Sequence, residues 1–167
     1  IFNHILKIIL NNNFLITNSK SHFLEYSRAK FSYANTPISN ELFFQCSGLL
    51  EERGLENQEV KIFEWDNLKC FFRVGPKSAL PFDIFSASFF LLSRYEEYMP
   101  YKGDKSSQFN YFESLAYKEN FLEIPLIDLW VERFKFLLEN KLKLKCKMVL
   151  KNHKTSIIIS SLFPYKY

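Results

Sequence analysis

The sequence predicts an α+β fold in which two or three helices pack against a mixed sheet. Apolar residues recur at helical spacing in some segments and alternate with polar residues in others. These two kinds of segment mix without the regular strand–helix alternation that predicts a parallel sheet. The composition is that of a folded chain, since 47% of the 167 residues are hydrophobic and 18% are aromatic. One domain of this length buries a sizeable core.

In the first half of the chain, a helix is predicted over about 1–10, where apolar residues follow helical spacing. Short strands are predicted at 14–17, 27–35 and 41–50. The strongest local signal is a hairpin near 60–74, where β-rich runs at 60–65 and 68–74 flank Asp66 and Asn67. This pair tolerates the positive φ angles of a two-residue hairpin turn.

In the second half, helices are predicted at 84–98 and 126–140. Asp83 can cap the first, which is apolar on nearly every side, and Pro100 prevents its continuation. The second has one apolar face and one charged face. The polar segment between them, 101–120, is expected to be a long loop. Strands are expected at 141–150, where lysines alternate with apolar residues, and at 157–159.

A charged cluster follows the buried part of the helix predicted over 84–98. Arg94 lies beside Glu96 and Glu97, and a guanidinium near a core needs hydrogen-bond partners, for which Glu97, Asp104 and Glu113 are candidates. A catalytic acid/base pair is one hypothesis, but neighbouring carboxylates lie about 100° apart on a helix and cannot easily face one reacting atom. A structural clamp that ties the following loop to the helix is therefore the favoured interpretation.

Motifs of common catalytic and cofactor sites are absent from the sequence. The three cysteines include no Cys-x-x-Cys pair and are expected to be buried free thiols. The three histidines have no metal-ligand spacing, and there is no Gly-rich phosphate-binding motif. No cofactor and no metal ligand are therefore expected in this chain.

Charge and hydropathy limit the classes of partner. The net charge of +4 comes from 22 basic and 18 acidic residues, which is a weak argument for a polyanion. A lysine face at 141–147 leaves a nucleic-acid or scaffold interaction module as an alternative function, although nucleic acid is not the favoured partner. No membrane span or signal peptide is visible, so a cytoplasmic location is the expectation. Because the chain begins at Ile1, a fragment or processed product is also expected.

Five stretches carry a family signal. They are KFSYAN (30–35), ELFFQCSGLLEERGL (41–55), LPFDIFSASFFLLSRYEEYMPYKGDK (80–105), ESLAYKENFLEIPLIDLW (113–130) and PYKY (164–167). Together they resemble the uncharacterised N-terminal accessory domain of bacterial, especially Bacteroidetes, polysaccharide deacetylase-like proteins. The combination of 80–105 with 113–130 is the most specific part of the resemblance. Asp128 and Trp130, at the end of the second block, join the candidate clamp or interaction residues.

The resemblance implies an accessory domain over 1–150, followed at 151–167 by the opening strand of a catalytic domain that is missing or degenerate. In the resembling family, aspartates at the end of that strand and downstream histidines hold a divalent metal that activates water for deacetylation. Here the aspartate positions fall on Ser160 and Leu162. The resemblance therefore implies no catalytic residue in this chain, and a divalent metal only in a complete parent protein.

Two functions remain open from the resemblance. The leading one is a non-catalytic accessory domain that packs on a deacetylase-like catalytic domain in cis or contacts glycan. The alternative is that this chain is a fragment of an active metal-dependent polysaccharide deacetylase, with its ligands encoded after Tyr167. The reading frame on both sides of the chain distinguishes them.

Overall fold

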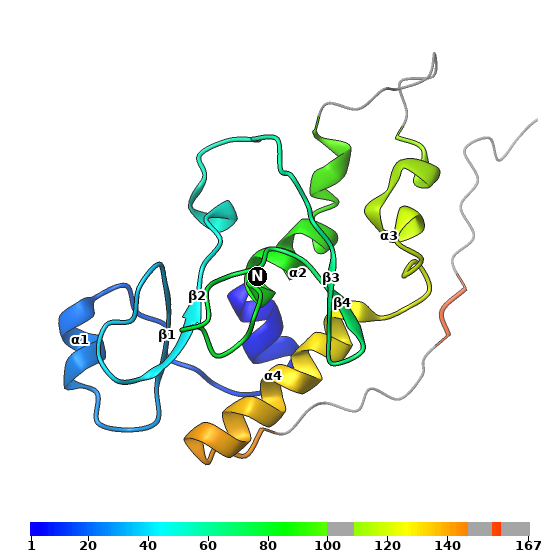
Figure 1. Cartoon of the computed structure of the whole chain (residues 1–167). Helices are drawn as coiled ribbons and strands as arrows, with labels where there is room; N and C mark the ends of the chain where they lie inside the picture. Colours follow the sequence, from blue (N-terminus) through cyan, green and yellow to red (C-terminus); the bar gives the residue numbers. More distant parts are fainter. Residues whose placement is uncertain (100–108, 147–154, 158–167) are drawn as a thin grey trace, which may run out of the picture.

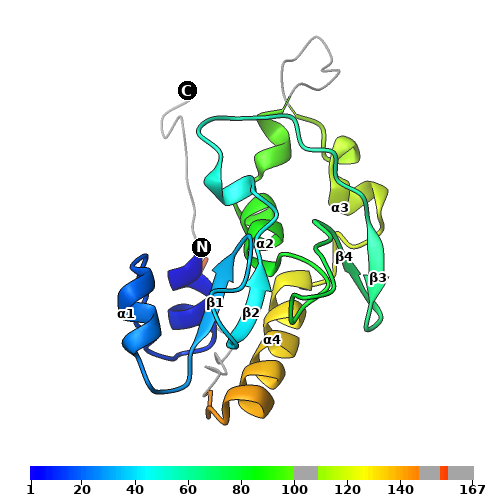
Figure 2. The same cartoon turned by 60° about the vertical axis from the view of Figure 1, so that its left-hand side comes forward.

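The computed structural model describes residues 1–99, 109–146 and 155–157, and the α+β class is confirmed in them. The helical elements are η1 (His4–Ile9, a π-helix), α1 (Lys20–Glu25), the 3₁₀ helix η2 (Leu49–Glu51), α2 (Ile84–Leu92), the 3₁₀ helices η3 (Tyr95–Glu97) and η4 (Tyr111–Glu113), α3 (Leu115–Lys118) and α4 (Leu126–Leu142). The strands are β1 (Phe31–Ala34), β2 (Leu42–Gln45), β3 (Phe63–Trp65) and β4 (Leu68–Cys70). Figures 1 and 2 show α1 beyond the β1–β2 pair, with the hairpin and α3 on the opposite side of α2.

The strands form two separate two-stranded sheets in the described residues, so both pairings expected of a mixed sheet occur but not in one sheet. β1 and β2 are parallel, with Phe31 opposite Leu42, and β3 and β4 are antiparallel. The predicted hairpin is confirmed, and Asp66 and Asn67 have φ angles of 51° and 60°. In Figure 2, α4 lies between the two sheets.

α4 connects both sheets because its buried side chains contact each of them. Phe134 packs against Phe31 of β1 and Phe44 of β2, at ring-centroid distances of 5.9 and 5.0 Å. The Trp130 indole N–H donates a hydrogen bond of 3.1 Å to the Lys69 carbonyl of β4. With the fully buried face of α2, these contacts form one core cluster. The predicted amphipathic helix at 126–140 is therefore confirmed and organises the core.

The parallel β1–β2 pair has an unusually short connection, residues 35–41, which the carboxylate of Glu41 holds in place. Parallel strands ordinarily need a crossover of about a dozen residues or more. The Glu41 carboxylate accepts hydrogen bonds from the Ser32 hydroxyl, the Ser39 hydroxyl and the backbone N–H groups of Ile38 (2.9 Å) and Ser39 (2.7 Å). Burial acts to raise the pKa of Glu41, but these hydrogen bonds outweigh it and lower the pKa from 4.5 to about 2.

We expect Glu41→Gln to destabilise the fold in a pH-dependent way. The folded pKa lies below the unfolded one, so the stabilisation by the ionised carboxylate is fully present above about pH 4.5 and is lost as the pH falls toward 2. After allowance for solvent screening, the variant should lose about 1–2 kcal/mol of unfolding free energy at pH 7. Urea denaturation at a series of pH values measures the difference.

A surface carboxylate provides the control for this experiment. Glu59 pairs with Lys61 at 3.1 Å, and both side chains are about four-fifths exposed, at 81% and 80%. Glu59→Gln should change the unfolding free energy by less than about 1 kcal/mol at any pH. An equal loss for Glu41→Gln at pH 7 and at pH 2 would contradict the role given to its carboxylate.

The helix predicted over 84–98 is shorter than expected. Asp83 caps it as predicted, but α2 ends at Leu92, and Arg94 adopts a left-handed conformation with φ 54°. The Ser93 hydroxyl donates to the Phe89 carbonyl at 2.7 Å, a side-chain bond that competes with continued helix. The chain therefore turns at Arg94 and continues as η3.

Several other predictions from the sequence are wrong, and some fall partly outside the described residues. No strand forms at 14–17, where Leu15 is 85% exposed, and α1 and α3 form where no helix was predicted. The prediction of a strand at 141–150 is wrong for its first residues, because α4 continues to Leu142 and residues 143–146 have no regular structure. The rest of that segment, 147–150, lies outside the described residues. The first helix is confirmed in position as η1. Of 157–159, only Ile157 is described, and it is not in a strand.

The cysteine expectation is confirmed, since Cys46, Cys70 and Cys146 are free and buried. Burial raises the pKa of Cys46 to about 11 and that of Cys70 to about 12, so both are neutral thiols near pH 7. Across the described ranges, no helix has the length and apolar character needed to span a membrane.

Candidate functional site

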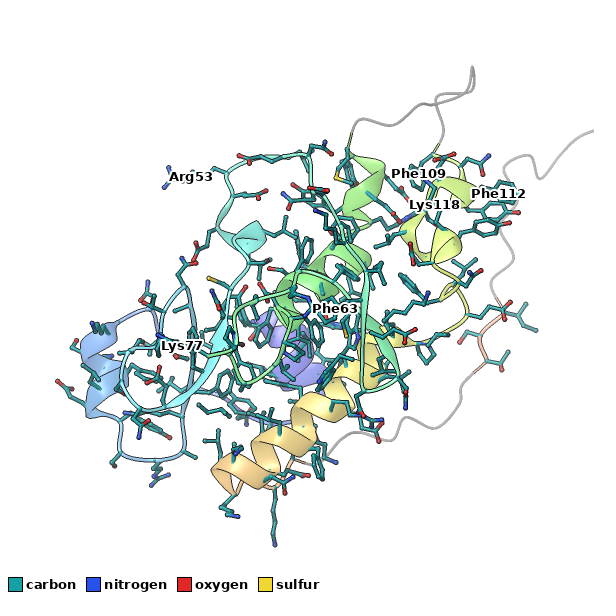
Figure 3. All side chains as sticks on the ribbon, in the orientation of Figure 1. Arg53, Phe63, Lys77, Phe109, Phe112 and Lys118 are labelled. Atoms are coloured by element: carbon teal, nitrogen blue, oxygen red, sulfur yellow. The ribbon has the colours of Figure 1, made fainter. Side chains whose placement is uncertain are left out.

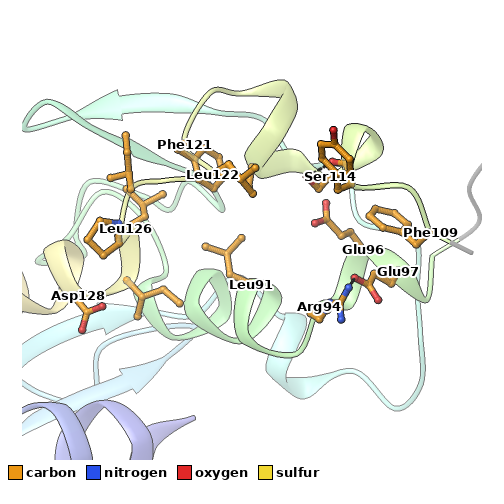
Figure 4. Close-up of a pocket in the computed structure, with 15 residues that line it drawn as sticks. Leu91, Arg94, Glu96, Glu97, Phe109, Ser114, Phe121, Leu122, Leu126 and Asp128 are labelled. Atoms are coloured by element: carbon orange, nitrogen blue, oxygen red, sulfur yellow. Dashed lines mark hydrogen bonds and ion pairs between the residues drawn. The ribbon is translucent and has the colours of Figure 1, made fainter. Parts of the chain in front are cut away.

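A pocket of about 410 Å³ lies between the end of α2, with η3, and the chain that runs through η4 and α3 to the start of α4 (Figure 4). This volume is within the range of small-molecule sites in proteins, about 300–1,000 Å³. Apolar side chains line most of it, including Leu91, Phe121, Leu122, Leu126 and Ile127. Its polar side chains are Arg94, Glu96, Glu97, Ser114, Tyr111 and Asp128.

The turn at Arg94 aims the acidic side chains of η3 at the pocket. Figure 4 shows Glu96 reaching from η3 toward Ser114, while Arg94 and Glu97 lie together near Phe109. Arg94 forms an ion pair with Glu97, three residues further on, and its own side chain is 73% exposed. In a regular helix Arg94 and Glu97 would also share one face, but Glu96 would lie about 100° away from Glu97.

Glu96 ties η3 to α3 across the pocket. Its carboxylate accepts a hydrogen bond of 2.7 Å from the backbone N–H of Leu115, the first residue of α3. The hydroxyl of Ser114 caps the same helix by accepting from the Tyr117 N–H, and it donates to the Tyr111 carbonyl. Glu96 thus links the turn after α2 to the segment that follows, whereas Arg94, on which the predicted clamp was centred, pairs with Glu97 of its own turn.

The electrostatics of the pocket are negative. Burial raises the pKa of Glu96, and the neighbouring Glu97 adds to this effect, while the Leu115 N–H, Lys118 and Arg94 oppose it. Three carboxylates and one guanidinium line the pocket, which leaves a formal charge of −2 when all are ionised. Asp128 is exposed and lies at the opposite end of the pocket from Glu96 (Figure 4).

An exposed aromatic cluster adjoins the pocket. It consists of Tyr111, Phe112 and Tyr117, which are 56%, 46% and 42% exposed. Their ring centroids lie 4.0 Å apart for Tyr111 with Phe112 and 4.9 Å apart for Phe112 with Tyr117. Figure 3 shows Phe112 at the outer edge of the molecule. Because Tyr111 also lines the pocket, the aromatic cluster and the pocket form one continuous surface.

The structure distributes the predicted site residues unevenly. Four of them, Arg94, Glu96, Glu97 and Asp128, line the pocket. Glu113 lies outside the lining and pairs with Lys118 at 2.7 Å. The remaining two are Trp130, which is fully buried in the core, and Asp104, which lies outside the described residues.

Sequence reasoning missed the aromatic and aliphatic half of the site. The segment 109–125 supplies Tyr111, Phe121 and Leu122, yet the sequence predicts a loop over most of it. A signal was present, because Asn110 and Ser114 are typical N-cap residues that precede apolar side chains, and each caps a short helix here.

In the described ranges 1–99, 109–146 and 155–157, no group of three or more His, Cys, Asp or Glu side chains is arranged to hold a metal ion. Among the described residues, the pocket lining offers carboxylates but no histidine, so it lacks the combination of aspartate and histidine ligands that the resemblance implies for a catalytic domain.

Comparison with known proteins gives one result. A model described as a family of unknown function (DUF7033) matches residues 1–143. No curated protein and no solved structure matches the chain.

Proposed function

Since the chain belongs to DUF7033, a family of unknown function, we propose that it is a non-catalytic, glycan-contacting accessory domain of a polysaccharide deacetylase-like protein. The resemblance of 80–105 and 113–130 to such accessory domains supports the deacetylase context. The continuous surface of pocket and aromatic cluster supports glycan contact. In a complete parent protein, a deacetylase-like domain in cis would supply the divalent metal and the chemistry.

The aromatic cluster beside the pocket carries the proposal. The faces of pyranose rings are largely C–H groups, which pack well against exposed aromatic rings, while their hydroxyl groups need polar partners. Tyr111 and its neighbours offer the rings, and the carboxylates of the pocket offer hydrogen-bond acceptors. The cluster holds its three rings in contact, so little side-chain freedom remains to be lost on binding.

Oligosaccharide binding tests this proposal. Isothermal titration with tetrasaccharides of β-1,4-linked glucose, N-acetylglucosamine and glucosamine should give measurable binding of at least one of them. Tyr111→Ala should weaken that binding roughly tenfold, the effect of about 1.4 kcal/mol from a lost aromatic contact. The matched control is Tyr26→Ala, because Tyr26 is similarly exposed, at 41%, and lies at the end of α1.

Two results would contradict the proposal. One is absence of binding for all three tetrasaccharides, and the other is equal weakening by Tyr111→Ala and Tyr26→Ala. The deacetylase context has a separate test, the reading frame after Tyr167, which should encode a domain with aspartate and histidine metal ligands. Metal-dependent release of acetate by the present chain alone would overturn its non-catalytic assignment.

A further inference from the structure

We infer that the pocket selects sugars with a free amino group, that is, deacetylated units of a glycan, over their acetylated or neutral counterparts. The inference rests on the proposed function, because it names the class of glycan that this surface takes. It is carried by the charge of the pocket lining, by the position of Glu96 within it and by the apolar walls around that carboxylate.

The charge of the lining favours a cation over a neutral or anionic sugar. Of the three carboxylates that line the pocket, Glu97 already pairs with Arg94. Glu96 and Asp128 remain without an ion pair of that kind in the part of the chain that the structure describes. An ammonium group bound in the pocket would donate charge-assisted hydrogen bonds to such a carboxylate, and these bonds are shorter and stronger than neutral ones.

Glu96 is placed to be the principal partner of that ammonium group. Its side chain is half-buried in a pocket whose lining also includes Leu91 and Phe121, and screening by water is weaker there than at the open surface. Within the described residues, the one hydrogen bond that its carboxylate accepts comes from the Leu115 backbone N–H. The nearby cations Lys118 and Arg94 already form ion pairs with Glu113 and Glu97, so they offset the negative charge of Glu96 only in part and leave it available to a cationic ligand.

The fold does not need the charge of Glu96. A glutamine at this position has the same shape, and its amide oxygen can accept from the Leu115 N–H. Since burial disfavours the ionised form of Glu96, Glu96→Gln should be at least as stable as the wild-type chain near pH 7.5. A charge that is unfavourable for folding and faces a pocket of ligand size is typical of a functional site.

An N-acetyl group would fit this pocket less well than a free amine. Acetylation removes the positive charge and adds an amide whose carbonyl oxygen is an acceptor, which faces the acceptor oxygens of the carboxylates. The sugar ring itself contacts Tyr111 and Leu122 in either case, because both side chains are more than half exposed at the pocket. The discrimination therefore depends on the amino group, whereas the aromatic contact is common to all pyranoses.

The test compares the tetrasaccharides of glucosamine, N-acetylglucosamine and glucose at one ionic strength. Isothermal titration should give at least tenfold tighter binding of the glucosamine tetramer, the effect of one charge-assisted contact of about 1.4 kcal/mol. Glu96→Gln should reduce this preference to less than about threefold, because it should weaken binding of the glucosamine tetramer more than binding of the glucose tetramer.

Glu123→Gln is the matched control, because Glu123 is an exposed carboxylate of the same connection that does not line the pocket. It should retain the full preference for the amine. Thermal melting by circular dichroism establishes that each variant is folded. Asp128→Asn provides a second variant in the lining, at an exposed position, and should lower the preference as well.

The outcomes separate this inference from the proposed function. Equal affinity for all three tetrasaccharides, with loss on Tyr111→Ala, supports glycan contact and overturns amine selection. A preference for the amine that Glu96→Gln and Glu123→Gln weaken equally also overturns it, since general electrostatic attraction then suffices. Absence of all binding overturns both. A tenfold preference that disappears only with the lining variants supports the inference.

Discussion

Trp130→Ala should lower the free energy of unfolding by about 3–5 kcal/mol, the usual cost of removing a large aromatic side chain from a packed core. The Trp130 side chain is 0% exposed and packs against Phe71 and Phe82, with ring-centroid distances of 5.6 and 5.2 Å. Its indole N–H also satisfies the Lys69 carbonyl of β4. Because a domain of this kind has only about 5–15 kcal/mol of stability, the loss is severe.

Two further variants define the origin of this effect. Trp130→Phe keeps an aromatic ring but not the N–H, and it should cost about 1–3 kcal/mol because the Lys69 carbonyl loses its donor. Phe136→Ala removes an aromatic side chain that is 67% exposed on the same helix and should change stability by less than about 0.5 kcal/mol. Urea denaturation followed by far-ultraviolet circular dichroism measures all three. Equal losses at positions 130 and 136 would contradict the buried position of Trp130.

Asp83→Ala should be about as damaging, with a loss of about 3–5 kcal/mol. The Asp83 carboxylate is 1% exposed. One of its oxygens accepts from the Phe85 and Ser86 N–H groups at 3.1 Å, which caps α2. The other accepts from the Ser47 N–H at 2.7 Å and from the Tyr33 hydroxyl at 2.8 Å, which joins α2 to β1 and to the end of β2. Its removal leaves buried donors unsatisfied.

The coupling between Asp83 and Tyr33 provides the decisive control. Burial and the nearby carboxylate raise the pKa of Tyr33, so its hydroxyl remains a donor at neutral pH. A double-mutant cycle with Tyr33→Phe and Asp83→Ala should give a coupling energy of at least about 1 kcal/mol. Ser19→Ala removes the cap of the exposed helix α1 and should cost less than about 1 kcal/mol. Additive effects of the two core changes would contradict the network.

The elements that could be predicted from the sequence are those whose signals are local. Asp66 and Asn67 specify a hairpin turn through their own tolerance of positive φ, and Asp83 specifies the start of α2 through its own side chain. The apolar residues of 126–140 likewise lie on one face, and this face identifies the buried side of the helix. In each case the residues that carry the signal are the residues that form the structure.

Features that depend on distant partners could not be predicted. β1 and β2 pair in parallel across a short connection, residues 35–41, in which Glu41 accepts a hydrogen bond from Ser32 of β1. The residues of the connection alone do not specify a parallel pairing. The left-handed turn at Arg94 falls on a residue with no intrinsic preference for it. The strand predicted at 14–17 is wrong because a short run of apolar residues does not supply a neighbouring strand to pair with.

For the same reason, only half of the candidate site could be predicted from the sequence. Its charged residues, Arg94, Glu96 and Glu97, were recognised because charges after a buried helix stand out in a sequence. The opposite wall, with Phe121 and Leu122, comes from a segment more than twenty residues later and is brought there by the tie between Glu96 and Leu115. A pocket is a property of two segments, whereas a sequence pattern describes one.

An NMR titration of the isotopically labelled chain with the glucosamine tetramer tests the central claim, glycan contact at the pocket, most directly. The predicted result is that amide shifts concentrate at the pocket and the aromatic cluster, at residues such as Leu91, Glu96, Leu115 and Leu122, and that they are absent from α1 and the β3–β4 hairpin. Shifts that concentrate away from the pocket, for example around the lysines at the end of α4, or no shifts at all, would contradict the claim.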